Sequence, residues 1–357
     1  MYIRQLYDAL DGHGARFWLL VVVGTLLAVI SIIENIWVFI AFLSDRARSL
    51  FFFYILLAPF DILIALTYIF VHTVFQLVVY LHLNYGNDSS VALSLNQYVY
   101  GSVRIWGFLI TVLHASTTTA QCRYLSTTVA VYLLVSAAIE CFLFVQRPNR
   151  PTSHALRYML LVLAVLLALV MELSRILEFG IEHVAECTGT LQEHQLVMSE
   201  LLTHPFYNDV FVRVRTFVCD LLPFVLLFVF VVVAIVHLAK RKNRFNVEQN
   251  ESIEQTTWTN ADTRTLGMIA LAHVILAGLP WIVLNVWTSI SYASVRVHYG
   301  SIAAAGNILL LICTVIRLPI YATNPSMRLA LFPNCRNELT SHRLTATGEH
   351  TTKPLLS

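Results

Sequence analysis

The sequence predicts an all-α membrane protein, a seven-transmembrane helix bundle with its N-terminus outside and its C-terminus inside. Of its 357 residues, 57% are apolar and only 12% are charged, whereas an ordinary soluble domain has roughly 25% charged residues. Several apolar segments reach or exceed the roughly 20 residues that cross the hydrocarbon core of a bilayer as a helix. Their number and the distribution of positive charge between them predict the topology.

The apolar segments are separated by polar connections, which set their boundaries. The segments lie at 17–43, 50–81, 116–145, 155–180, 213–239, 265–289 and 299–322. The stretch 99–115 has three possible interpretations: an outward extension of the third helix, a re-entrant loop or an eighth span. An eighth span would place both termini on the same side of the membrane, which the charges of the connections disfavour.

Positive charge gathers on alternate connections, after the first, third, fifth and seventh spans. The residues concerned before the tail are Arg46, Arg48, Arg147, Arg150 and the run KRKNR at 240–244. In contrast, 176–212 contains no Lys or Arg. Because basic connections stay in the cytoplasm, the connections after the odd-numbered spans are expected inside.

The chain divides into three parts by composition. Residues 1–16 are expected to form an extracellular N-terminus, 17–332 the seven-helix domain with a short amphipathic cytoplasmic helix in PSMRLALF, and 333–357 a hydroxyl-rich, disordered cytoplasmic tail. The polar stretch 245–264 predicts a solvated cytoplasmic loop. Asn87 begins an N-x-S sequon in the first outer loop, where it predicts glycosylation.

The sequence lacks the motifs of common enzymes and metal sites. It contains no Walker motif, HExxH, plausible catalytic triad or glycine-rich phosphate loop. Its six cysteines lack the spacing of metal ligands or CxxC pairs. We therefore expect no enzymatic activity, no metal and no cofactor. The net charge of +2 says little about partners; we expect no nucleic-acid partner, and the lipid bilayer is the partner that the composition predicts.

Short motifs recur in order along the spans. Span one carries Asn35 in IIENIWVF, span two carries Asp61 in LLAPFD, and span three ends in AAIECFLFVQRP. Span five has Pro223 in LLPFVLL, span six has Pro280 in LPWIVLN, and span seven runs GNILLLICTVIRLPIY. In their order and spacing, these motifs resemble those of rhodopsin-like (class A) G-protein-coupled receptors, over about residues 17–332.

Within that superfamily the chain resembles invertebrate and nematode neuropeptide receptors of the FMRFamide and myosuppressin type. MELSRILEF at 171–179 is similar to that group's NLPRFFE, and GNILLLICTVIRLPIY to its SNLLLVLNSSINFIIY. The resemblance implies a plasma-membrane receptor for an extracellular peptide. It also implies a heterotrimeric G protein at the inner ends of helices three, five and six, and an arrestin at a phosphorylated tail.

The inner end of helix three departs from the family pattern of Asp or Glu, Arg and Tyr. The spacing to Pro148 places Glu140, Cys141 and Phe142 on these positions. A neutral thiol cannot bind a carboxylate bidentately, as arginine does. The family's resting lock and its arginine contact with the G protein are therefore both missing from the pattern.

Other family positions differ as well. The helix-seven Asn-Pro-x-x-Tyr motif becomes RLPIY, which keeps Tyr321 but has Arg317 at the asparagine and its proline displaced by one residue. Helix six has no tryptophan directly before Pro280. Cys187 matches the outer-loop partner of the family disulfide, but the matching helix-three position is Ser116.

Arg317 is a charge in the middle of an apolar span, where charges are costly and usually functional. The resemblance places Asp61 opposite it, at a site where many family members hold sodium. We expect the Arg317 guanidinium to replace sodium by pairing with Asp61, with help from Glu34. The alternative is that its flexible stem lets Arg317 extend to the cytoplasmic headgroups.

Several residues near the ends of spans are candidates for binding or modification. Glu178 either pairs structurally with charges on its own helix or attracts a cationic peptide. Tyr207, Asn208 and Trp287 lie near outer helix ends and are pocket candidates, although aromatic residues at that depth are also interfacial anchors. Cys335 is a juxtamembrane cysteine, either palmitoylated or a free cytosolic thiol.

Two alternative functions stay open. A chemosensory receptor for small molecules shares the fold, and its expression in sensory neurons would distinguish it from a neuropeptide receptor. A transporter or channel would explain the charges within the spans, but the internal repeat typical of many transporters is absent.

Overall fold

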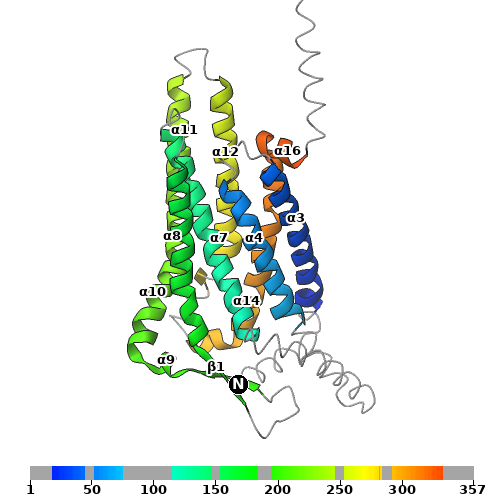
Figure 1. Ribbon diagram of the computed structural model, residues 1–357, viewed down its shortest axis with the longest axis vertical. Helices are drawn as coiled ribbons and strands as arrows, with labels where there is room; N and C mark the ends of the chain where they lie inside the picture. Colours follow the sequence, from blue (N-terminus) through cyan, green and yellow to red (C-terminus); the bar gives the residue numbers. More distant parts are fainter. Residues whose placement is uncertain are drawn as a thin grey trace, which may run out of the picture.

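The computed structural model describes residues 18–44, 52–74, 115–146, 153–183, 194–245, 253–280, 282–283 and 292–332. Nearly all of them are helical, and the long helices run side by side along one axis (Figure 1). The all-α prediction is confirmed at this level. The predicted terminal parts, 1–16 and 333–357, and the candidate residues Asn87, Cys187, Trp287 and Cys335 lie outside the described residues.

The bundle is built from seven longer α-helices within the described ranges, two of which continue into π-helical turns. The long helices are α3 (Gly24–Ser44), α4 (Phe52–Tyr68), α7 (Ala115–Gln146), α8 (His154–Glu172), α11 (Leu222–Phe245), α12 (Ile253–Ala272) and α14 (Tyr292–Val315). The shorter α-helices are α9 (Glu200–Thr203), α10 (Val212–Thr216), α15 (Arg317–Thr323) and α16 (Pro325–Leu331). The π-helical turns are η1 (Leu19–Val23), η3 (Ile69–Val74), η6 (Tyr207–Phe211), η7 (Phe217–Leu221) and η8 (His273–Gly278).

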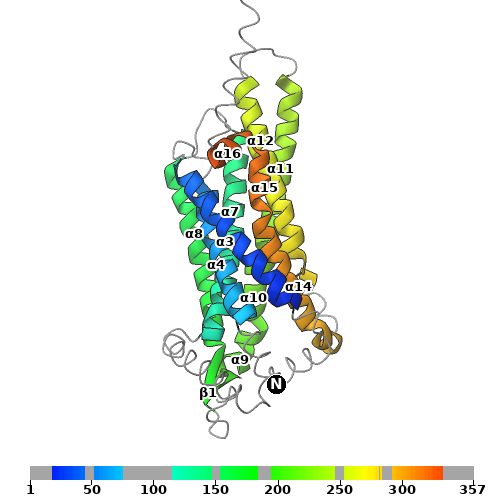
Figure 2. The ribbon, with the colours of Figure 1, turned by 90° about the vertical axis from the view of Figure 1, so that its right-hand side faces the viewer.

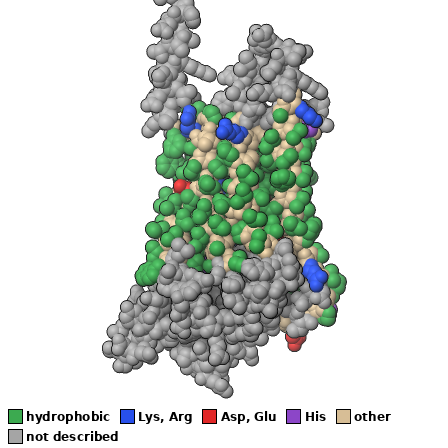
Figure 3. All heavy atoms as spheres, turned by 180° about the vertical axis from the view of Figure 1, so that it is seen from behind, with side chains coloured by type: hydrophobic (Ala, Val, Ile, Leu, Met, Phe, Trp, Pro, Cys, Tyr) green, Lys and Arg blue, Asp and Glu red, His purple; other side chains and the backbone are tan. Residues whose placement is uncertain are grey.

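Five helical segments among the described residues are long and apolar enough to cross a membrane. They are Leu20–Leu43, Arg123–Gln146, His154–Glu172, Val212–His237 and Ala304–Thr323, and the apolar helix Phe52–Tyr68 is shorter. Large apolar side chains are exposed along α3, α8 and α11. In the face shown in Figure 3, apolar side chains cover the middle of the molecule and Lys and Arg lie near its ends. These are the features of a helical membrane protein.

Helix α7 lies at the centre of the bundle, packed against α4, α8 and α11. Its small residues Ala130, Ser136, Ala137 and Ala138 are all buried, and small side chains let neighbouring helices approach closely. The largest hydrophobic core joins α7 to α3, α4, α11, α12, α15 and α16.

Proline explains why two helices change their winding. Pro223 follows the π-turn η7 and Pro280 follows η8. Proline has no N–H, and its ring clashes with the carbonyl four residues earlier. That carbonyl belongs to Cys219 in η7 and to Leu276 in η8. A widened turn relieves the clash, which is a known cause of helix distortion.

The seventh predicted span consists of two helices, because Pro319 cannot donate to the Val315 carbonyl. Helix α14 therefore ends at Val315, and α15 begins after Ile316. Asn324 then ends α15 and caps α16, since its side chain accepts from the backbone N–H of Ser326 at 3.0 Å. Asparagine is a preferred N-cap. The stretch after the span that was predicted to be a short helix is helical in the structure, as α16.

Two sequence predictions need correction. The fourth span was predicted to continue to residue 180, but α8 ends at Glu172 and is followed by the 3-10 helix η4 (Leu173–Leu177). Strand β1 (Phe179–His183) then pairs antiparallel with β2 (His194–Met198). The stretch 245–264 was predicted to be a loop, but α12 begins at Ile253. Helix α12 as a whole packs against α11 and α7, whereas the polar composition of 253–264 gave no signal of a helix.

Candidate functional site

Buried and half-buried polar side chains form three layers along the bundle. We call them the hairpin layer (His72, Arg123, Asn307), the middle layer (Asp61, His273, Arg317) and the α16 layer (Glu140, Cys141, Asp262, Thr263, Asn324). In Figures 1 and 2, the hairpin strand β1 lies at one end of the bundle and α16 at the other. Helices α14 and α15 follow one another along the bundle, and we call them the helical line α14–α15. Asn307 of α14 belongs to the hairpin layer and Arg317 of α15 to the middle layer, and Asn324 of the α16 layer directly follows α15.

The middle layer contains the ion pair expected from the sequence. A guanidinium nitrogen of Arg317 donates to Asp61 Oδ2, and both side chains are about 1% exposed. The other terminal nitrogen, Nη2, lies 3.2 Å from His273 Nδ1. The pair therefore joins α15 to α4, and the imidazole adds η8 of the sixth predicted span. Removing one member of such a buried pair leaves an uncompensated charge.

Two details of the sequence hypothesis are corrected by this geometry. The second group at Arg317 is His273 rather than Glu34, whose Oε2 has no hydrogen-bond partner among the described residues. Extension of Arg317 to the headgroups is also excluded, because its guanidinium is buried on Asp61. The sequence did not indicate that Arg317 is the partner of His273, because an isolated histidine in an apolar span carries no partner information.

Neighbouring residues hold the middle layer in place. Tyr321, one turn along α15 from Arg317, packs edge-to-face on Phe42 and Tyr54 with ring centroids 5.5 and 5.4 Å away. Asn35 donates to the Ser31 carbonyl at 2.8 Å. Ser31 in turn donates to the Thr314 hydroxyl at 2.8 Å, which links α3 to α14. Asn35 thus acts on this layer through Ser31.

At the α16 end, Glu140 and Cys141 have separate partners. Both Nε and Nη2 of Arg157 contact Glu140 Oε1, at 2.6 and 2.5 Å, so α7 is tied to α8. Cys141 Sγ lies 3.2 Å from Thr263 Oγ1 on α12. The thiol therefore makes a single weak contact with α12, where an arginine would offer five N–H donors.

Asn324 is the stronger link between α12 and the end of α15. Its Nδ2 donates to Asp262 Oδ1 at 2.7 Å and to Thr265 Oγ1 at 3.2 Å. Its Oδ1 accepts from both the backbone and the hydroxyl of Ser326. One buried amide thus caps α16 and fastens the α15–α16 elbow to α12. We call the contact between Asn324 and Asp262 the amide clasp.

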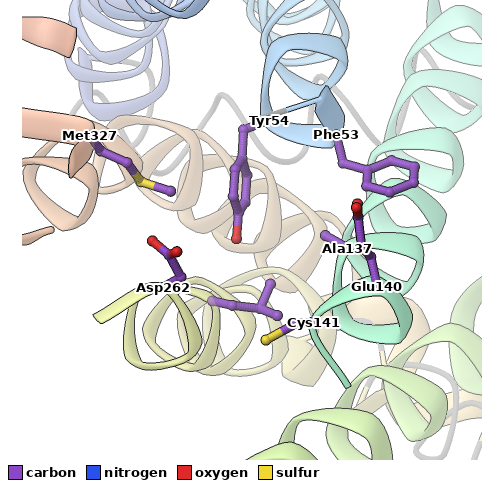
Figure 4. Close-up of a pocket in the computed structure, with 8 residues that line it drawn as sticks. Phe53, Tyr54, Ala137, Glu140, Cys141, Asp262 and Met327 are labelled. Carbon is purple, nitrogen blue, oxygen red and sulfur yellow. The ribbon is translucent and has the colours of Figure 1, made fainter. Parts of the chain in front are cut away.

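A cavity of about 30 Å³ lies within the α16 layer, enough for one or two water molecules. Its lining residues are Phe53, Tyr54, Ala137, Glu140, Cys141, Asp262, Leu266 and Met327. Figure 4 shows Tyr54 of α4 reaching between Asp262 of α12 and Glu140 of α7. The cavity thus lies between α4, α7 and α12, beside the Cys141 contact that joins α7 to α12.

The hairpin layer was not foreseen from the sequence. His72 Nε2 lies 2.9 Å from Arg123 Nη1 on α7 and 2.9 Å from Asn307 Nδ2 on α14. Asn307 is ten residues before Arg317, about 15 Å at 1.5 Å per residue. Arg123 stands at the start of an apolar span and among polar residues, STTTAQCRYLSTT at 116–128, so the argument that singled out Arg317 did not reach it.

Glu178 lies beyond the hairpin layer, at the start of the β-hairpin. It is buried, and it accepts from Arg215 Nη1 on α10 and from the Tyr207 hydroxyl at 2.9 Å. Burial raises the pKa of the Tyr207 phenol above its usual range, so this hydroxyl keeps its proton and donates. Asn208 follows Tyr207 in η6. Glu178 is therefore engaged in an internal ion pair rather than presented as an exposed charge.

Comparison with known proteins adds no assignment, since no family model matches the chain and no curated protein matches it.

Proposed function

We propose that the chain is a seven-helix, rhodopsin-like receptor of the plasma membrane. It binds an extracellular ligand, a neuropeptide, and transmits the binding to a heterotrimeric G protein. In this proposal the β-hairpin end faces outside and the α16 end faces the cytoplasm. Arrestin binds the phosphorylated tail.

The observation that carries the proposal is the helical line α14–α15. Within it, Asn307 contacts the hairpin layer, Arg317 the middle layer, and Asn324, directly after α15, the α16 layer. The helical line α14–α15 thus contacts polar partners from the outer half of the bundle to its inner end. Such a chain of contacts can carry a displacement across the bundle because packed elements change between discrete arrangements.

The mechanism follows from what holds the resting arrangement. The amide clasp joins α15 to α12, and Cys141 adds a weaker contact between α7 and α12. Movement of α12 away from α7 opens the cavity beside Cys141 to the cytoplasm, where the G protein binds. A ligand drives this change only to the extent that it binds the open arrangement more tightly. The clasp thus serves as the resting lock that the helix-three arginine provides in the family.

The test is a G-protein dissociation assay in cells that display the full chain at the surface. Neuropeptides with amidated and with free carboxyl ends are screened, and Cys141→Arg is assayed beside the natural chain. A peptide response from the natural chain supports coupling without the arginine. A response only from Cys141→Arg indicates a ligand-binding receptor that couples poorly. Silence from both variants, with surface display verified, refutes the proposal.

The buried charges favour a second candidate, a transporter or channel. Arg157, Arg215 and Arg317 are each buried and paired with a carboxylate, and intramembrane charges mark ion pathways in many transporters. Substrate-dependent uptake or current in liposomes containing the purified chain would support this function. A third candidate, a chemosensory receptor for small molecules, is distinguished by expression in sensory neurons.

A further inference from the structure

The cavity of the α16 layer contains a buried hydroxyl group that has no hydrogen-bond partner among the described residues, that of Tyr54. Tyr54 of α4 is 6% exposed, and its ring packs edge-to-face on Tyr321 with centroids 5.4 Å apart. Its side chain reaches between Asp262 and Glu140 (Figure 4). The aromatic contact thus holds the phenol in a fixed direction, with its hydroxyl in a cavity of about 30 Å³.

Two acceptor groups line the same cavity, the carboxylates of Asp262 on α12 and Glu140 on α7. Each already accepts an amide or guanidinium N–H at one oxygen, but an ionised carboxylate has about four acceptor sites. The Tyr54 hydroxyl makes no direct hydrogen bond to either of them. A buried hydroxyl without a partner carries a desolvation cost, and a gap of this kind between polar groups is commonly bridged by water.

The volume and the lining of the cavity indicate which ligand fits. A water molecule needs roughly 10–15 Å³ of such volume, so about 30 Å³ accommodates one or two. Four of the eight lining side chains carry a polar group, namely Tyr54, Glu140, Cys141 and Asp262. A buried water requires about two to four polar partners. A metal ion fits less well, because the described residues contain no group of three or more His, Cys, Asp and Glu side chains that could hold one.

We propose that the cavity binds ordered water that connects the Tyr54 hydroxyl to the Asp262 carboxylate. The phenol donates to the water oxygen, and the water donates to the carboxylate, which only accepts while it is ionised. This water link joins α4 to α12, and the amide clasp joins α12 to the end of α15. Tyr54 is therefore a positioning residue, which acts on α12 through water. As a second restraint on the resting position of α12, the link rests on the proposed function.

Tyr54→Phe tests the water link because it removes only the hydroxyl oxygen. If the cavity holds no water, this substitution removes an unpaired buried group, and the melting midpoint stays or rises. If water pairs the hydroxyl, a hydrogen bond is lost, and we expect the midpoint of the purified full chain to fall by about 2–4 °C.

Two matched substitutions calibrate that shift. Tyr132→Phe removes a hydroxyl that donates to the Val218 carbonyl at 2.6 Å, so it should lower the midpoint by a similar amount. Tyr158→Phe makes the same change at a side chain that is 57% exposed, so it should leave the midpoint unchanged.

Hydroxyl-radical labelling by X-ray pulses detects the water itself, because the radicals form from water molecules beside a side chain. Tyr54 and Tyr132 are similarly buried, at 6% and 7% exposed, but of these two only Tyr54 lines the cavity. We expect mass spectra of the natural chain to show that Tyr54 is labelled severalfold faster than Tyr132.

A double-variant comparison tests whether the water reaches Asp262. Tyr54→Phe and Asp262→Ala each break the water link, so their combined fall in midpoint should be smaller than the sum of the two single falls.

A midpoint of Tyr54→Phe at or above that of the natural chain overturns the proposal, as does equal labelling of Tyr54 and Tyr132. So does a strictly additive fall in the double variant. A midpoint that is higher in sodium chloride than in choline chloride, by a difference that Tyr54→Phe abolishes, also overturns it, because the occupant is then a cation. None of these readouts uses G-protein coupling. A cavity without water therefore leaves the coupling proposal in place, and a failed coupling assay leaves the water link in place.

Discussion

Replacing Asp61 by asparagine keeps the size of the side chain but removes the charge that neutralises Arg317. At a separation of about 3 Å and an effective dielectric constant of about 20, the lost attraction is roughly 5 kcal/mol. Measured losses of one partner in a buried pair are about 3–5 kcal/mol. His273, whose Nδ1 lies 3.2 Å from Arg317 Nη2, cannot replace the carboxylate, because an imidazole side chain carries no negative charge near neutral pH. Asp61→Asn should therefore destabilise the folded chain by about 3–5 kcal/mol.

The same reasoning predicts a partial rescue. In the double variant Asp61→Asn with Arg317→Gln, no charge is buried alone, and replacing both partners of a buried pair is often close to neutral. We expect the double variant to be more stable than either single variant. The coupling between the two sites should reach about 2–3 kcal/mol, the upper part of the range for residues in contact.

The assay is thermal unfolding of the purified full chain in one detergent at a fixed scan rate. A loss of this size lowers the midpoint on the order of 10 °C by the scaling of soluble domains. Arg264→Gln is the matched control, because that arginine is exposed, and its effect should stay within about 0.5 kcal/mol. If Asp61→Asn and the control unfold at the same temperature, or if the double variant is the least stable, the reasoning is wrong.

Two further predictions concern packing and the amide clasp. A Cβ at Gly24 would overlap the Tyr68 ring, so Gly24→Ala should cost about 1–3 kcal/mol of stability. A Cβ at Gly267 meets only Val231 and Ile235 carbons at 3.7 and 3.8 Å, so Gly267→Ala should be neutral or stabilising. The same melting assay checks both, and equal effects would contradict the packing argument. Asn324→Asp sets a carboxylate against Asp262 but still caps α16, because aspartate is also a good N-cap. This variant should raise ligand-independent G-protein dissociation, whereas adding Asp262→Asn should restore the basal level. An unchanged basal signal in Asn324→Asp would refute the clasp as the resting restraint.

The middle ion pair could be predicted because its signals are local and costly. A charged residue within an apolar span needs a partner, and the resemblance of the flanking motifs supplied the opposite position. The helices could be predicted equally well, because 57% of the residues are apolar and occur in long runs. In a bilayer such runs have few alternatives to the helix. The stretch PSMRLALF predicted a helix after the span, and the structure adds that Asn324, followed by Pro325, caps it as α16.

The remaining contacts depend on where helices meet, which no single segment encodes. Arg123, Arg157 and Arg215 are also buried charges, but their partners lie 51, 17 and 37 residues away on other elements. The helical start of α12 was missed because 253–264 has no apolar pattern, although the helix as a whole packs against α11 and α7. The sequence by itself therefore determined the helical membrane class and the need to neutralise Arg317. Only the tertiary structure decided the other pairings, because side chains on different helices are brought within hydrogen-bond reach by the packing of the whole bundle.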